Sequence, residues 1–254
     1  MRTAWRGLVL TVVAIISVAG CHAARQSAVI DDSFTGRNGL IAAEKRTGGS
    51  TSGWLVTSGS LFRDNDEGWT GLPDDGRGEG DNGSAVFRMV SARRDLTDTD
   101  MTLRLKVDDL TATTRTPPRA FDGAHIWVRY QSDRQLYAVS VDRRDATMVI
   151  KKKCAGGDAN GGTYFDLGAP VAHAPIPFRH WQQISVEVHN RADGAVAIAA
   201  RRDGLVVEAI DDGVGCPPLR EGGVGIRGDN AELRFDDIRV IEAVAAPGRS
   251  DEVP

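Results

Sequence analysis

The stretch HIWVRYQSDRQLYAVSVD, residues 125–142, decides the fold class of this chain of 254 residues. Its first run alternates between two sets of side chains, Ile126, Val128 and Tyr130 on one side and His125, Trp127 and Arg129 on the other. Ser132-Asp133 is a turn signal, and a second alternating run follows from Tyr137 to Val141. Two runs of period two around a turn predict an antiparallel hairpin.

The same period recurs along the chain, in residues 101–107, 183–188 and 232–235. Turn signals such as Asp203-Gly204 separate the runs, and the spacing of 3.6 residues typical of helices is nearly absent between them. Many short strands without intervening helices pack as antiparallel sheets, face to face. The sequence therefore predicts an all-β protein, with one antiparallel β-sandwich domain of jelly-roll type over residues 30–242.

The formal net charge of the chain is −4 at pH 7. Removing residues 1–20, which carry Arg2 and Arg6, would bring it to about −6. A nucleic-acid partner requires a basic face, so this balance argues against one.

The first residues have the pattern of an export signal. Arg2 and Arg6 precede an apolar run from Leu8 to Ala19, which is too short to span a bilayer and ends in Val18-Ala19-Gly20-Cys21. This ending resembles the lipobox of bacterial lipoproteins. The resemblance implies that residues 1–20 are a signal peptide and that Cys21 carries lipid such as palmitate. Residues 21–29 would then be a tether that anchors the domain to the extracytoplasmic face of the cell membrane.

Two other interpretations of this segment are an uncleaved N-terminal helix and an ordinary secretory signal with an incidental cysteine. At the opposite end, residues 243–254 contain alanine, proline and charge without periodicity. We expect this tail to be disordered.

Besides Cys21 the chain contains only Cys154 and Cys216. An exported protein lies in a compartment that permits disulfides, so a bond between these two is the expected state. Two free thiols are the alternative. A metal site fits less well, because no neighbouring cysteine or histidine has the usual ligand spacing.

Several short motifs, in their order and spacing, resemble concanavalin A-like (laminin G-like) jelly-roll domains. They are Asp31-Asp32-Ser33-Phe34, Gly53-Trp54-Leu55-Val56, Ser58-Gly59-Ser60-Leu61, the hairpins from Val128 to Lys152, Trp181 to Val188, Arg202-Asp203-Gly204, Gly223 to Arg227 and Phe235 to Val240. The resemblance covers about residues 30–241 and implies a fold without specifying an activity. We expect Phe34 and Phe235 to face the core from first and last strands that lie side by side, and Gly204 and Gly223 to occupy positions that need positive φ or close backbone approach.

Domains of this kind often hold structural calcium near their joined termini, which implies a calcium site at Asp32 and Asp236. Solvated or turn-capping aspartates would explain the same residues.

Residues 64–84 form the longest irregular stretch, rich in glycine and acidic residues. This stretch is either a calcium-binding or substrate-gating loop or a solvated surface loop, and Trp69 within it is either a ligand contact or an anchor.

The sequence lacks the common catalytic motifs. Glucanases of this fold carry a strand of the type Glu-x-Asp-x-Glu, and the nearest approach here is Glu79-Gly80-Asp81, with no second glutamate following. The arginine, histidine and tyrosine strands of the lyases of this fold form no convincing set. A serine-nucleophile elbow, a zinc motif and a phosphate loop are also missing from the sequence.

A candidate binding face remains on the predicted hairpin of residues 125–142. His125, Trp127 and Arg129 share one side of a strand, and Lys151 and Lys153 follow nearby. A tryptophan beside histidine and arginine suits stacking on a sugar ring and hydrogen bonding to hydroxyls or carboxylates. In the alternative, Trp127 packs under a loop and its neighbours face solvent.

The leading hypothesis is a membrane-anchored lipoprotein whose jelly roll binds a glycan at the cell envelope without catalysis. A glycoside hydrolase or polysaccharide lyase, using groups such as His125, Arg129 and Asp142, is the second hypothesis. The third is a structural or adhesion lipoprotein that contacts another envelope protein.

Overall fold

The computed structural model describes residues 27–44, 53–74 and 85–242. The expected signal peptide, Cys21 and the tail 243–254 lie outside these ranges, as do residues 75–84 of the acidic loop. Within the described ranges, no helix has the length and apolar character needed to cross a bilayer.

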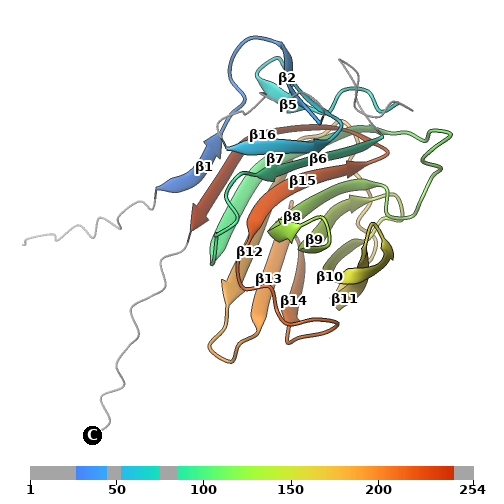
Figure 1. Ribbon diagram of the computed structural model, residues 1–254. Coiled ribbons are helices and arrows are strands. Elements are labelled where there is room, and N and C mark those ends of the chain that lie inside the picture. Colours follow the sequence, from blue (N-terminus) through green and yellow to red (C-terminus); the bar gives the residue numbers. More distant parts are fainter. Residues whose placement is uncertain (1–26, 45–52, 75–84, 243–254) are drawn as a thin grey trace, which may run out of the picture.

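The described residues form sixteen strands in two antiparallel sheets, which confirms the predicted fold class (Figure 1). The nine-stranded sheet contains β1 (Ala28–Asp32), β2 (Gly39–Ala43), β4 (Ser60–Asp64), β5 (Glu67–Trp69), β7 (Thr99–Leu110), β12 (Gln182–Asn190), β13 (Val196–Arg202), β14 (Leu205–Asp211) and β16 (Ala231–Glu242). The seven-stranded sheet contains β3 (Trp54–Ser58), β6 (Val86–Ser91), β8 (Gly123–Ser132), β9 (Gln135–Arg143), β10 (Met148–Ala159), β11 (Gly162–Val171) and β15 (Gly223–Asp229).

The strands of the larger sheet follow the order β14-β13-β12-β7-β16-β5-β4-β2, and β1 also pairs with β16. Those of the smaller sheet follow the order β11-β10-β9-β8-β15-β6-β3. Strands that are neighbours in a sheet are therefore often far apart in the sequence, as in the pairing of β7 with β16. This long-range pairing brings residues of β8, β9, β10 and β15 onto one continuous face.

The core lies between the sheets and is built by the alternating residues. On β7, Met101, Leu103, Leu105 and Val107 are all fully buried. One hydrophobic cluster joins them to Ile126, Val139 and other inward residues of the smaller sheet. Burying each such side chain contributes about 1.5–3 kcal/mol relative to exposing it. The periodicity therefore predicted which faces form the core.

The first and last strands lie side by side, as predicted (Figure 1). Asp32 of β1 pairs with Ile238 of β16, and the rings of Phe34 and Phe235 meet edge to face with their centroids 5.3 Å apart. Gly204 has a φ of 93°, which favours glycine. A Cβ atom on Gly223 would lie only 2.6 Å from the Arg93 carbonyl oxygen, so both expectations about glycine are confirmed.

The prediction that residues 64–84 are irregular is wrong for their first part. Glu67–Trp69 form β5, which pairs with both β4 and β16. Trp69 donates from Nε1 to Glu232 Oε1 at 2.9 Å, and the Arg234 guanidinium lies over its ring. Trp69 therefore acts as an anchor for this segment.

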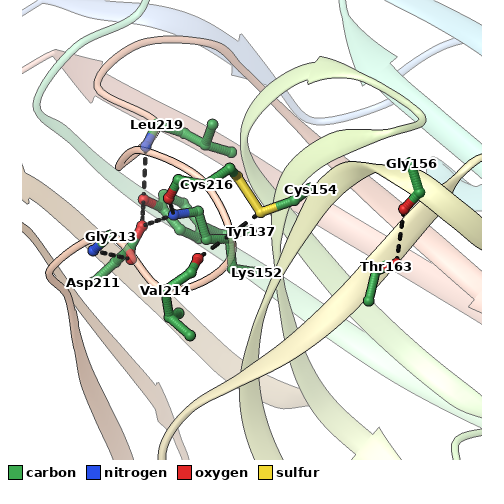
Figure 2. Close-up of a disulfide and its surroundings, with 10 residues drawn as sticks. All are labelled: Tyr137, Lys152, Cys154, Gly156, Thr163, Asp211, Gly213, Val214, Cys216 and Leu219. Carbon is green, nitrogen blue, oxygen red and sulfur yellow. Dashed lines mark hydrogen bonds and ion pairs between the residues drawn. A yellow bond between two sulfur atoms is a disulfide. The ribbon is translucent and has the colours of Figure 1, made fainter.

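The disulfide between Cys154 and Cys216 is present, as predicted. It joins β10 of the smaller sheet to the loop that leads from β14 to β15. Beside it, Lys152 Nζ lies 2.8 Å from Asp211 Oδ2 and also donates to the Cys216 carbonyl oxygen (Figure 2). The disulfide and the ion pair thus hold the same loop.

Replacing both cysteines with alanine should lower the free energy of unfolding. The bond spans 62 residues of sequence, and the chain-entropy model gives about 4 kcal/mol for a loop of this size. Urea unfolding of the wild type and of the double variant measures the difference. Reductant should shift the wild-type midpoint toward that of the variant and leave the variant unchanged, and coincident unfolding curves would contradict the prediction.

Candidate functional site

The outer face of the smaller sheet carries a hollow of about 400 Å³, which we call the main hollow. Because the pairing places His125 opposite both Ser140 and Arg227, side chains from separate strands converge there. The strands supply His125 and Trp127 from β8, Ala138 and Ser140 from β9, Lys151 and Lys153 from β10, and Arg227 and Asp229 from β15.

The rim of the main hollow comes from loops, from the last residues of β9 and β10, and from β11. It consists of Phe121, Arg143, Asp158, Ala159, Asn160 and Tyr164. The Phe121 side chain is 45% exposed, and Tyr164 is half-buried. Two of the rim and wall cations have carboxylate partners, since Arg143 pairs with Asp145 and Lys151 pairs with Asp166 at 2.7 Å.

A chain of polar contacts crosses the floor. Arg227 makes a two-pronged contact with Asp229, with distances of 2.6 Å from Nε and 2.7 Å from Nη2 to the two carboxylate oxygens. His125 Nε2 lies 3.2 Å from Asp229 Oδ2, and His125 Nδ1 lies 2.8 Å from Ser140 Oγ. This network fixes the orientations of all four side chains.

The same network sets the protonation of the floor. Burial alone would raise the pKa of Asp229, but the Arg227 guanidinium and His125 outweigh it and hold that pKa well below its ordinary value. Burial would likewise lower the pKa of Arg227, and Asp229 outweighs it. The pair therefore stays ionised and is neutral as a unit.

Lys153 is the exception among the cations of the main hollow. Its Nζ donates to the Asp133 carbonyl oxygen at 2.6 Å and lies 5.1 Å from the centre of the Tyr164 ring. No carboxylate pairs with it in the described ranges. Burial and the nearby Arg227 charge lower the pKa of Lys153 to about 8.

Comparison of the sequence with protein-family models finds no match, and comparison with curated proteins finds none either. Comparison of the structure does find relatives in fold. A carbohydrate-binding module of Bacillus subtilis, CBM66, superposes with a TM-score of 0.50 at 15% identity, over 76% of this chain and 97% of the module.

Two further solved structures are similar. The exoplasmic/lumenal domain of VIP36, in the form bound to Ca²⁺ and Man3GlcNAc, has a TM-score of 0.50 at 9% identity over 85% of this chain and 94% of its own. The carbohydrate recognition domain of Emp46p, in a metal-free form, has a TM-score of 0.51 at 6% identity over 81% and 97%. The fold is a lectin-like jelly roll. At these identities the likeness concerns the fold alone.

Two of the three predicted binding residues, His125 and Trp127, line the main hollow of this jelly roll. Trp127, however, is only 1% exposed, so it is packed, as in the alternative interpretation, rather than open for stacking on a sugar. It stacks on Tyr130, with ring centroids 5.4 Å apart, in a small cluster on the outer face. Trp127 therefore forms the floor, and the accessible aromatic rings are those of the rim.

Arg129 does not line the main hollow, and the prediction that it shares a face with Trp127 is wrong. It has a φ of 51°, and the pairing of β8 with β9 shifts register between Val128 and Ser132. An irregularity of this kind interrupts the alternation of side chains. Tyr130 consequently joins Trp127 outside, while Arg129 is buried and donates to the Leu96 and Val188 carbonyl oxygens.

Asp142, which the enzyme hypothesis placed with His125 and Arg129, is fully buried away from the hollow. Its carboxylate accepts from Arg202 Nη1 at 2.6 Å and from Gln182 Nε2 at 2.9 Å, and so connects the two sheets. Burial raises the pKa of Asp142 even though these partners oppose the shift. The structure does not bring the three groups together.

The two residues expected to hold calcium, Asp32 and Asp236, make contacts within the protein. Asp32 accepts from the Phe34 amide at 2.9 Å and from Trp54 Nε1 at 3.1 Å, which is the capping role given above as the alternative. Asp236 lies 3.5 Å from Arg104 Nη1. In the part of the chain that the structure describes, no group of three or more His, Cys, Asp or Glu side chains could hold a metal ion.

Sequence reasoning missed most of the residues that line the main hollow, among them Phe121, Tyr164, Arg227 and Asp229. Arg227 and Asp229 lie two apart on one strand, which is a signal for a shared face. Nothing local places that strand beside His125, because β15 and β8 are separated by about ninety residues of sequence, as their pairing shows.

The lowered pKa of Lys153 predicts a titration near pH 8, well below the ordinary value of 10.5. Unfolding restores the ordinary pKa, so the unfolded chain binds more protons between about pH 8 and pH 10.5, and the Lys153 contribution to stability rises with pH across that window. NMR titration of the lysine side chains measures the pKa of Lys153, and the Lys153→Met variant assigns its signal. A midpoint near 10.5 would refute the environment described.

Proposed function

We propose that this chain is a carbohydrate-binding protein and that its ligand occupies the main hollow. One observation supports the proposal above others: aromatic rings and hydrogen-bonding side chains from five strands and two loops converge in a single cavity of about 400 Å³. Ligand sites combine a mainly apolar lining with a few placed polar groups in this way.

A sugar ring matches both parts of this lining. Its C–H face can pack on the accessible rings of Tyr164 and Phe121, and its hydroxyls can accept from Lys153 or donate to Asp158 and Asn160. The floor is already held rigid by the Arg227–Asp229 pair. The neighbours in fold, described as carbohydrate-binding or carbohydrate-recognition domains, support the same class of ligand.

Glycan-array screening of the purified protein, with calcium and then with EDTA, tests the proposal. We expect saturable binding, and we expect Tyr164→Ala to weaken it by about tenfold because a stacking surface is lost. Tyr164→Phe keeps the ring and should bind within about twofold of wild type. Absence of binding under both conditions would reject the carbohydrate proposal and leave a structural or adhesion lipoprotein.

The proposal includes a lipid anchor at Cys21 on the extracytoplasmic face of a bacterial cell membrane. It rests on the basic start, the short apolar run and the small residues before that cysteine. Acylation would hold the domain at the membrane, because each buried CH2 contributes about 0.8 kcal/mol.

Cys21→Ser should therefore move the protein from the membrane fraction to the soluble fraction. Fractionation of cells measures the change, and mass spectrometry of the wild-type N-terminal peptide should show acyl chains. Arg201→Ala is the control, since it changes one exposed side chain outside the signal sequence and should leave the protein in the membrane fraction. An unmodified N-terminus in the wild type would rule out the anchor.

A glycan-cleaving enzyme is the second candidate, and Lys153 is the observation that favours it. An amine with a pKa of about 8, beside the Tyr164 ring, suits proton abstraction from a sugar, as a lyase requires. A hydrolase fits less well because Asp229, one of two carboxylates in the main hollow, is held by Arg227. Shorter saccharides accumulating with time would identify an enzyme.

A further inference from the structure

The main hollow adjoins a second hollow of about 240 Å³. Phe121, Arg227 and Asp229 line both cavities, so the two meet at these side chains. The Phe121 side chain is 45% exposed. It presents an apolar surface between the hollows, where a chain of sugar units would cross.

The carboxylates that line the second hollow already accept hydrogen bonds from protein side chains. Asp122 is 1% exposed, and its Oδ2 accepts from the Arg119 amide at 2.9 Å, from Arg144 Nε at 3.2 Å and from Asn230 Nδ2 at 3.2 Å. Asp229 is held by Arg227, as described above. Neither carboxylate therefore presents free negative charge to a ligand.

The Arg119 guanidinium, in contrast, is available. Its side chain is exposed on the loop before β8, and it makes no hydrogen bond or ion pair with any residue in the described ranges. The main hollow offers a corresponding charge in Lys153, whose Nζ donates to a main-chain oxygen. Neither Lys153 nor the Arg119 guanidinium pairs with a carboxylate of the described residues.

Buried polar atoms without partners provide an independent indication of a ligand. Asn230, 3% exposed, lines the second hollow, and its Oδ1 accepts no hydrogen bond from any residue that the structure describes. Trp127 lines the main hollow, and its Nε1 donates to none of the described residues. Buried polar groups are nearly always satisfied, and a saccharide offers both the donor and the acceptor that these atoms lack.

We propose that the ligand is an acidic oligosaccharide that occupies both hollows, crosses the Phe121 ring with the face of a sugar unit and places an anionic group against Arg119. This inference rests on the proposed carbohydrate function and adds the class of glycan. A guanidinium matches the planar oxygens of a carboxylate, and it also binds sulfate. The shared requirement is an anionic oxygen group on the sugar.

Isothermal titration of the whole chain, purified in detergent, tests the inference with three probes of equal length. They are a tetrasaccharide of galacturonic acid, its methyl ester and a sulfated tetrasaccharide. The ester removes only the charge, so the acid should bind about fivefold more tightly, and the ratio should fall as salt is raised. The sulfated probe shows which of the two anions the site prefers.

Arg119→Ala should bring the affinity ratio of acid to ester close to one. Arg201→Ala is the matched control, since it removes one exposed arginine from the other sheet and should leave that ratio as in wild type.

Phe121→Ala should weaken binding of the tetrasaccharide more than binding of a disaccharide, because only the longer ligand crosses the ring. Both Arg119 and Phe121 are exposed, so circular dichroism should show unchanged folding.

Equal affinities for acid, sulfated and esterified probes, or an acid preference that survives Arg119→Ala, would overturn this inference while leaving the carbohydrate proposal intact. Failure of every saccharide to bind, neutral ones included, would reject both together.

Discussion

The arrangement of this molecule depends on charged groups that are buried between its two sheets. Lys152 and Asp211 are both fully buried, and they join β10 of one sheet to β14 of the other. The Tyr137 hydroxyl donates to the same carboxylate at 2.5 Å and accepts from the Leu219 amide at 2.9 Å (Figure 2). Removing one partner of such a pair leaves an uncompensated charge and costs about 3–5 kcal/mol. If only aliphatic side chains packed between the sheets, one sheet could shift relative to the other. The ion pair and its hydrogen bonds are satisfied in one alignment of the two sheets only.

That fixed alignment allows the outer face to act as a rigid site. Arg202 of the larger sheet reaches Asp142 of β9, and Ser140, two residues earlier on the same strand, points outward and meets His125. Contacts between the sheets and contacts in the hollow therefore share the same short strands. Because the Arg227–Asp229 pair is already ionised and oriented, a ligand would not have to reorganise it on binding. Preorganisation of this kind increases affinity by reducing the cost of ordering side chains.

The sequence predicted the features that follow from period-two alternation. The inward residues of β7, the pairing of the terminal strands and the disulfide could all be inferred, because apolar patterning and cysteine count report on burial and compartment. Arg129 shows the limit, since one residue with positive φ reversed the side to which its side chain points. Trp127 shows another, because alternation distinguishes the two faces of a strand but does not say whether side chains such as Tyr130 will cover the outer one. Phe121 and Tyr164 reach the hollow from segments whose position depends on long-range pairing.

The local charge of the two hollows differs from the net charge of the protein. The protein has a net charge of −4, yet Asp122 and Asp229 are each engaged by an arginine. Lys153 and the Arg119 guanidinium line the two hollows without pairing with a carboxylate of the described residues. Overall charge therefore says little about which ligand the site attracts, since screening limits surface charges to about 8–10 Å at ordinary ionic strength. A ligand in the hollows therefore interacts mainly with the positive charges that no carboxylate neutralises. This fold hosts many functions, so the binding specificity depends on these unpaired cations and on the aromatic rings beside them.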